Sequence, residues 1–212
     1  MHRGRGVDVR LGTTVEALTG EGRVSGARLS GGETLAATAV VIGIGIVPNV
    51  ALAAAAGLDI DNGVRVDALC RTSDPDIFAA GDVTNHPNDL LGRNIRLESW
   101  ENAQNQGIAA AKAMLGGENP YCEIPWFWSD QYDVNIQLVG LPADFEETVT
   151  RGERADGSFV EFYMKGGRID GAAAINNPRD IRFAKRLMQA QKTVDPAALA
   201  DPSVKLQALL RG

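Results

Sequence analysis

The sequence predicts an α/β chain: a small antiparallel meander and parallel strands, followed by an α+β C-terminal region with an antiparallel sheet. Three observations support this class. Short alternating segments separated by glycines open the chain, a charge-free apolar run occupies residues 34–58, and strand-like segments joined by glycine-bearing turns fill residues 134–175. Alternation is typical of half-buried strands, and continuous apolar runs are typical of strands buried on both faces.

The first predicted elements are three short strands at residues 7–11, 14–18 and 23–29, where apolar and polar side chains alternate. The turns between and after them contain glycines, which favour chain reversal. These glycines are Gly20, Gly22, Gly31 and Gly32. We therefore expect an antiparallel meander at the start of the chain.

The charge-free run at residues 34–58 has the length of a membrane span, but Pro48 would break a spanning helix. Its first part, residues 40–42, instead predicts a strand buried on both faces. Residues 50–56 predict a short alanine-rich helix. We therefore expect no membrane segment.

The middle of the chain is predicted to alternate short strands with turns. Residues 63–67 form one predicted strand, and a turn at residues 73–76 precedes a second strand that ends at Gly81 and Asp82. Residues 84–93 are polar and contain a proline and a glycine, so they predict a loop.

The longest predicted helix runs from Ser99 to Met114. Ser99 is a suitable N-cap, and small residues recur at helical spacing at Ala103, Gly107 and Ala110. After Pro120 we expect an antiparallel sheet and then helices. The strands are predicted at residues 134–139, 147–151, 159–164 and 169–175, and the helices at residues 178–191 and after Pro196 and Pro202.

Composition excludes several function classes. A net charge of −6 argues against general nucleic-acid binding, and the presence of only two histidines, His2 and His86, argues against a histidine-based triad or a histidine metal site. Cys70 and Cys122 form no C-x-x-C motif, so we expect no zinc site or local redox disulfide. Two thiols and no visible signal peptide indicate the cytoplasm.

Several features have both a structural and a functional interpretation. Asp82 after Gly81 at a strand end either caps a turn or accepts hydrogen bonds from a sugar-like hydroxyl. The tryptophans of "PWFWSDQ", residues 125–131, form either core or a wall for a planar ligand. Gly43 and Gly45 permit close approach of a ligand, although they lack the rest of a dinucleotide fingerprint.

The order "TSDPDIFAAGDV", "ESWENAQNQG" and "PWFWSDQ" resembles the FAD-dependent, NADH-using ferredoxin reductases of ring-hydroxylating dioxygenase and cytochrome P450 systems. The resemblance runs along essentially the whole chain, but both G-x-G-x-x-G motifs of the family are absent. It implies hydride transfer from NADH to FAD, then single-electron transfer to an acidic iron–sulfur ferredoxin, with no acid–base residue required.

The resemblance also implies domains and site residues. Residues 1–48 correspond to the end of the NADH-binding domain, residues 49–118 to the returning part of the FAD-binding domain, and residues 119–212 to the C-terminal domain. The implied FAD residues are Gly81, Asp82, Val83, Trp100, Ala103 and Trp128, and the implied NADH residues are Gly43, Ile44 and Gly45.

A basic segment is the candidate docking face for the ferredoxin, because it stands out in an acidic chain. Its residues, with two upstream arginines, are Arg93, Arg96, Arg179, Arg182, Lys185 and Arg186. Two alternatives stay open: a non-catalytic fragment without flavin, and a flavoprotein like apoptosis-inducing factor. Self-association would cover apolar surfaces of incomplete domains.

Overall fold

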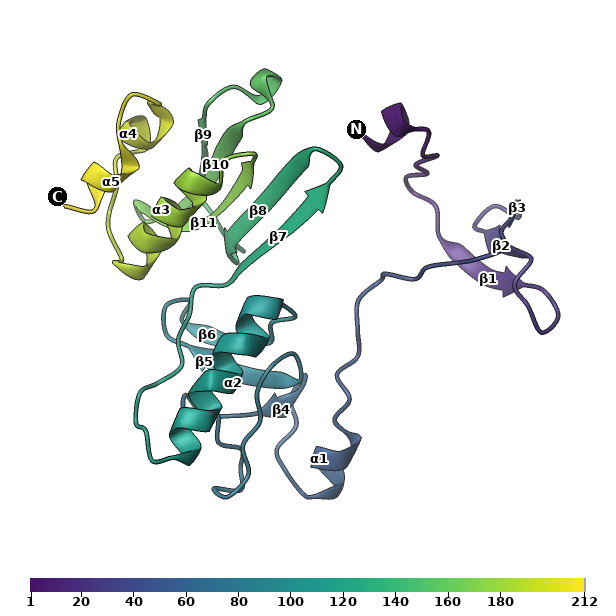
Figure 1. The fold of residues 1–212 in the computed structure, drawn as a ribbon, viewed down its shortest axis with the longest axis horizontal. Coiled ribbons are helices and arrows are strands. Elements are labelled where there is room, and N and C mark those ends of the chain that lie inside the picture. Colours follow the sequence, from purple (N-terminus) through teal and green to yellow (C-terminus); the bar gives the residue numbers. More distant parts are fainter. Residues whose placement is uncertain (212) are drawn as a thin grey trace. The chain divides into compact units, whose positions relative to one another are not determined.

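The computed structural model describes residues 1–211 and divides into two compact units, Met1–Val47 and Pro48–Gly212. Figure 1 labels the helices and strands of both units in chain order. The structure confirms the predicted α/β class, because a meander, a small mixed sheet and a larger antiparallel sheet follow one another along the chain. Each unit is described separately below.

The first unit contains a short 3₁₀ helix and a three-stranded antiparallel sheet in the order β1-β2-β3. The elements are η1 (His2–Arg5), β1 (Val15–Thr19), β2 (Gly26–Leu29) and β3 (Thr34–Ala36). The meander prediction is confirmed, but a strand at residues 7–11 is wrong. The chain pairs residues 34–36 with β2 instead, and Leu11 is exposed.

The predicted buried strand at residues 40–42 is also wrong. These residues have no regular secondary structure, and Val41 has a relative solvent exposure of 97%. A strand buried on both faces needs neighbouring strands to pair with and other elements, usually helices, packed over both faces of the sheet. Within residues 1–211 no strand pairs with this segment, so its apolar side chains are uncovered.

The second unit begins with a small mixed sheet and the longest helix, α2, which lies over that sheet in Figure 1. Its elements are α1 (Ala51–Ala55), β4 (Val64–Arg65), β5 (Thr84–Asn88), β6 (Arg93–Ile95) and α2 (Trp100–Met114). Strand β4 pairs with β5 in parallel, and β5 pairs with β6 antiparallel. The predicted helices are confirmed, and Ser99 caps α2 by accepting from the backbone N–H of Asn102.

Strand β5 occupies the segment that the sequence predicted as a loop. The prediction failed because β5 is buried although it is polar: Thr84, Asn85 and Asn88 each make side-chain hydrogen bonds to other segments. Conversely, the strand expected after residues 73–76 is reduced to a single bridge between Arg71 and Phe78.

The C-terminal part of the second unit is a five-stranded antiparallel sheet in the order β7-β8-β11-β10-β9. All four predicted strands are confirmed, and β7 is additional, because its aromatic residues do not show clean alternation. The strands are β7 (Trp126–Gln131), β8 (Val134–Gly140), β9 (Glu147–Arg151), β10 (Phe159–Lys165) and β11 (Arg168–Ile175), with a 3₁₀ turn η2 (Arg154–Asp156).

Helix α3 (Pro178–Gln189) covers one face of this sheet, and α4 (Pro196–Ala200) and α5 (Leu206–Leu209) follow it (Figure 1). The core between sheet and helix is fully apolar at its centre, where Val160, Phe162 and Leu187 are buried. Burial of such side chains contributes about 1.5–3 kcal/mol each. The C-terminal sheet therefore has its own core.

His86 on β5 is buried, and neither ring nitrogen has a hydrogen-bond partner within residues 1–211. Its ring packs against that of Tyr121, with centroids 5.5 Å apart. Burial lowers the pKa of His86, because the protonated ring loses its hydration.

We predict that the second unit loses stability as the pH falls below about 6.5, where the unfolded histidine gains a proton that the folded one resists. The loss is at most about 1.4 kcal/mol per pH unit. Thermal melts at about pH 7.5 and 5.5 test this. His86→Gln should flatten the difference and His2→Gln should not; equal slopes in the two variants would contradict the role of His86.

Candidate functional site

Gly81 lies at the point where the chain turns from the Arg71–Phe78 bridge into β5, next to helix α2. Its φ of +85° is in the left-handed region that favours glycine. Its N–H donates to Oε1 of Gln106 at 2.8 Å, and the hydroxyl of Thr84 donates to the same oxygen at 2.8 Å. A Cβ at Gly81 would lie 3.7 Å from that of Ala103, in ordinary contact. Conformation, rather than crowding, therefore requires the glycine.

Asp82 follows with an exposed side chain. The turn here is closed by backbone, since the N–H of Thr84 donates to the carbonyl of Gly81. Among the described residues the Asp82 carboxylate has no hydrogen bond that would make it a turn cap. This arrangement leaves the carboxylate open to an outside donor, and Val83 lies beside it in the chain, half-buried.

Two tryptophans that are distant in sequence meet near the start of α2. The ring of Trp100 approaches that of Trp128 edge-on, with centroids 6.3 Å apart and planes at 83°. Trp100 is 67% exposed and Trp128 is 41% exposed, so neither is a core residue. The structure thus gathers Gly81, Ala103 and Trp100 at one end of α2, and Trp128 joins them through Trp100.

The basic residues do not form one free surface. Lys185 of α3 donates to both carboxylate oxygens of Glu101 in α2, at 2.9 and 3.1 Å, and both side chains are mostly buried. Arg96 pairs with Glu98 at 2.6 Å, and Arg93 donates to the carbonyl of Leu141 at 3.1 Å.

Lys185 and Arg96 are therefore each engaged in an ion pair within the chain, with Glu101 and Glu98 respectively. The exposed charges on α3 are those of Arg179, Arg182 and Arg186. They lie three and four residues apart, so they share one side of the helix.

The Gly43–Gly45 segment belongs to the first unit, whereas all the implied FAD residues belong to the second. Gly45 has a φ of +99°, and a Cβ added at either glycine would meet nothing within 4 Å. The backbone here is accessible, as close approach by a ligand would require.

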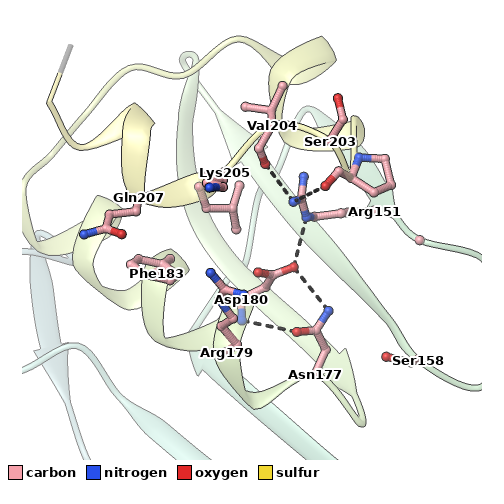
Figure 2. Close-up of a pocket in the computed structure, with 13 residues that line it drawn as sticks. Arg151, Ser158, Asn177, Arg179, Asp180, Phe183, Ser203, Val204, Lys205 and Gln207 are labelled. Atoms are coloured by element: carbon pink, nitrogen blue, oxygen red, sulfur yellow. Dashed lines mark hydrogen bonds and ion pairs between the residues drawn. The ribbon is translucent and has the colours of Figure 1, made fainter.

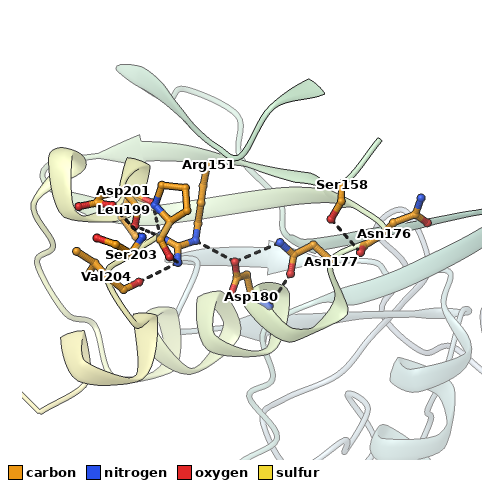
Figure 3. A network of polar contacts seen from close by, with 10 residues as sticks. Arg151, Ser158, Asn176, Asn177, Asp180, Leu199, Asp201, Ser203 and Val204 are labelled. Carbon is orange, nitrogen blue, oxygen red and sulfur yellow. Dashed lines mark hydrogen bonds and ion pairs between the residues drawn. The ribbon is translucent and has the colours of Figure 1, made fainter. Parts of the chain in front are cut away.

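A cavity of about 480 Å³ lies between the end of β9, the start of α3 and the C-terminal segment (Figure 2). Sequence analysis missed it, because its central residue, Arg151, looks like any strand arginine. Arg151 is buried, and its guanidinium reaches five acceptors (Figure 3). These are Oδ2 of Asp180 and the backbone carbonyls of Leu199, Asp201, Pro202 and Val204.

Since a guanidinium has five N–H donors, this network leaves none for a ligand. Asp180 also accepts from the side chain of Asn177, which in turn caps α3. The Arg151 network therefore attaches the C-terminal segment to β9 and α3 and is structural.

The described residues offer little to other chemistries. Burial raises the pKa of Cys70 to about 11, so its reactive thiolate is scarce near neutral pH. Cys70 and Cys122 are both free thiols. Residues 1–211 contain no group of three or more side chains suited to a metal ion, and no helix among them is both long and apolar enough to cross a membrane.

Comparison with known proteins identifies the family. The pyridine nucleotide-disulphide oxidoreductase model matches residues 1–107, and the reductase C-terminal model matches residues 126–210. The chain belongs to the pyridine nucleotide-disulphide oxidoreductase family. This assignment agrees with the resemblance seen in the sequence motifs.

Relatives of this chain are named as ferredoxin reductases. It is 50% identical over 214 residues to the ferredoxin–NAD(+) reductase component of the anthranilate 1,2-dioxygenase system of Burkholderia cepacia, covering 99% of this chain and 52% of that protein. The ferredoxin reductase for the CYP199A2 system from Rhodopseudomonas palustris has a TM-score of 0.91 and 40% identity, covering 98% of this chain and 52% of the other.

A covalent putidaredoxin reductase–putidaredoxin complex contains a chain with a TM-score of 0.92 and 35% identity, over 99% of this chain and 51% of the other. The chain thus spans about half the length of the relatives it matches.

We predict that Arg151→Lys lowers the free energy of unfolding by about 3 kcal/mol, because lysine cannot satisfy the buried carboxylate and four carbonyls together. Chemical denaturation of the chain measures this. The control is Arg154→Lys, at an exposed ion pair with Glu161, for which we expect less than about 1 kcal/mol. Equal stabilities of the two variants would refute the structural role of Arg151.

Proposed function

We propose that the chain is the flavin- and partner-facing part of a reductase that passes electrons from NADH through FAD to an acidic iron–sulfur ferredoxin. One observation carries the proposal: two exposed indoles, Trp100 and Trp128, meet at the start of α2, and Gly81, which precedes the uncapped carboxylate of Asp82, lies beside Ala103 in the first turn of that helix. The relatives named as ferredoxin reductases support the same reading.

These residues have the chemistry that FAD requires. Asp82 would accept a hydrogen bond from a hydroxyl of the ribityl chain. Gly81 and Val83 would lie beside that ribityl chain, and the small side chain of Ala103 would leave room for it. The indoles of Trp100 and Trp128 would contact the planar ring. Bound flavin supplies the exchange between a two-electron donor and one-electron acceptors, so no acid or base from the protein is needed.

The start of α2 suits a ring that becomes negative on reduction, because unpaired N–H groups give this end a partial positive charge. Glu101 in the first turn would oppose that effect. Its ion pair with Lys185, at 2.9 Å, offsets the negative charge. We therefore assign Lys185 to the flavin end of α2 rather than to partner docking.

The remaining assignments follow the same proposal. Gly43, Ile44 and Gly45 would lie beside the nicotinamide, within an NADH-binding segment of residues 1–48. Residues 49–118 would complete the FAD-binding domain, and residues 119–212 would form the C-terminal domain. Two unpaired thiols favour the cytoplasm, and the uncovered apolar residues near Val41 favour self-association of the isolated chain.

A chimera tests the flavin site. The chain would replace the matching residues of the Burkholderia cepacia relative, so that the missing half is supplied. We expect a yellow protein that reduces a ferredoxin with NADH. A colourless chimera, or a flavin-containing one that reduces no ferredoxin, would overturn the proposed function and favour one of the two alternatives.

We predict that Asp82→Ala in this chimera weakens FAD binding about 10- to 100-fold, the effect of losing a hydrogen bond to a charged group. Flavin release during dialysis, followed by absorbance, measures the affinity. The matched control is Asp76→Ala, another exposed aspartate of the same segment, which should bind FAD normally. Unchanged FAD affinity in the Asp82 variant would remove Asp82 from the site.

We also predict that Arg182→Glu combined with Arg186→Glu slows ferredoxin reduction and weakens its salt dependence, because exposed arginines on α3 would attract an acidic partner. Stopped-flow reduction at low and high salt measures both effects. Arg23→Glu combined with Arg65→Glu, two exposed arginines outside α3 that change the net charge by the same amount, is the control for net charge. Equal rates in the α3 variant and the control would show that α3 is not the docking face.

A further inference from the structure

Trp128 lies between two other indoles, and the contact with Trp126 is the closer one. The rings of Trp126 and Trp128 stack with centroids 4.9 Å apart and planes at 24°. They are two residues apart on β7, so both project from the same face of the sheet. The exposed Trp128 would otherwise sample several rotamers. The stack therefore restricts the plane of its ring.

Packing alone does not hold Trp126 in place. Although Trp126 contacts the C-terminal core, it also lines a cavity of about 310 Å³ with Glu101, Gln137, Ile181 and Lys185. A side chain next to open space can rotate unless a directional contact holds it. That contact is the indole N–H, which donates to Oε1 of Gln137 at 3.2 Å.

Gln137 is itself oriented by a second hydrogen bond. Its side-chain N–H donates to Oδ1 of Asn135 at 2.9 Å, and the Asn135 amide donates to Oδ1 of Asp130 at 2.7 Å. The indole nitrogen can only donate, so Oε1 of Gln137 must face it. This chain of hydrogen bonds begins at Trp126 and ends at Asp130, both on β7, and passes through two residues of β8. Gln137 is 9% exposed. Each member thus fixes the direction of the next.

We propose that Trp126 is a positioning residue: anchored by Gln137, it holds the ring of Trp128 in one orientation for a planar ligand. The identity of that ligand as a flavin rests on the proposed function above. The orientation of Trp128 does not rest on it. Holding an aromatic wall in its bound orientation lowers the entropy lost on binding.

The test uses the chain labelled with 5-fluorotryptophan, whose three tryptophans give three ¹⁹F resonances. Single Trp→Phe substitutions assign them. Gln137→Met keeps the volume but removes the acceptor, and we expect the Trp128 resonance to shift and broaden as its neighbour becomes free to rotate. Asn135→Ala, which frees the Gln137 amide but leaves it present, should cause a smaller change of the same kind.

The control is Phe127→Leu, on the same strand but with its side chain on the opposite face, which should leave the Trp128 resonance unchanged. Far-UV circular dichroism identifies any variant that does not fold. If Gln137→Met does not fold, Asn135→Ala carries the test. A Trp128 resonance that is the same in both variants as in the parent would overturn the positioning role.

A second measurement separates this inference from the proposed function. In the chimera, Gln137→Met should weaken FAD binding about threefold to tenfold, the range expected for losing an aromatic contact. If the Trp128 resonance changes but FAD affinity does not, the positioning role stands and the flavin contact of Trp128 is wrong. If neither changes, the positioning role is overturned.

Discussion

One buried amide oxygen, Oε1 of Gln106, joins the candidate site to the rest of the second unit. It accepts from the N–H of Gly81 and from the hydroxyl of Thr84, so it ties the strand end to the middle of α2. Because Trp100 is the first residue of the same helix, its place relative to Gly81 follows from the geometry of α2. This contact acts together with the packing of Cys70 and Ala80 against Ala110 of α2, and it fixes the position of the Gly81 backbone relative to the helix that carries Trp100.

The C-terminal sheet depends on a similar kind of contact. Arg151 satisfies the carboxylate of Asp180 in α3 and four backbone carbonyls between residues 199 and 204. A buried charge is stable only when it is paired and hydrogen-bonded. The same side chain type therefore has two uses here: Arg151 organises the interior, while Arg179, Arg182 and Arg186 stay in solvent on α3.

The pairing of Lys185 with Glu101 shows why charge patterns along a sequence mislead. Lys185 follows Arg182 on the same helix, and local spacing groups them together. Its partner is 84 residues away in sequence, and only the packing of α3 beside the start of α2 brings them together. This ion pair also connects the two halves of the second unit at the place where the flavin is proposed to bind.

The sequence by itself determined the meander, helices α1, α2 and α3, and four strands of the C-terminal sheet, because hydrophobic period, capping residues and glycines act locally. It also identified the family, because the three motifs that carry the resemblance are short stretches of consecutive residues. Only the tertiary structure decided that polar β5 is a buried strand, that residues 40–42 are uncovered, and that Trp126 anchors to Gln137. Each depends on a partner distant in the chain, or on the lack of one among the described residues, and no local pattern encodes such a partner.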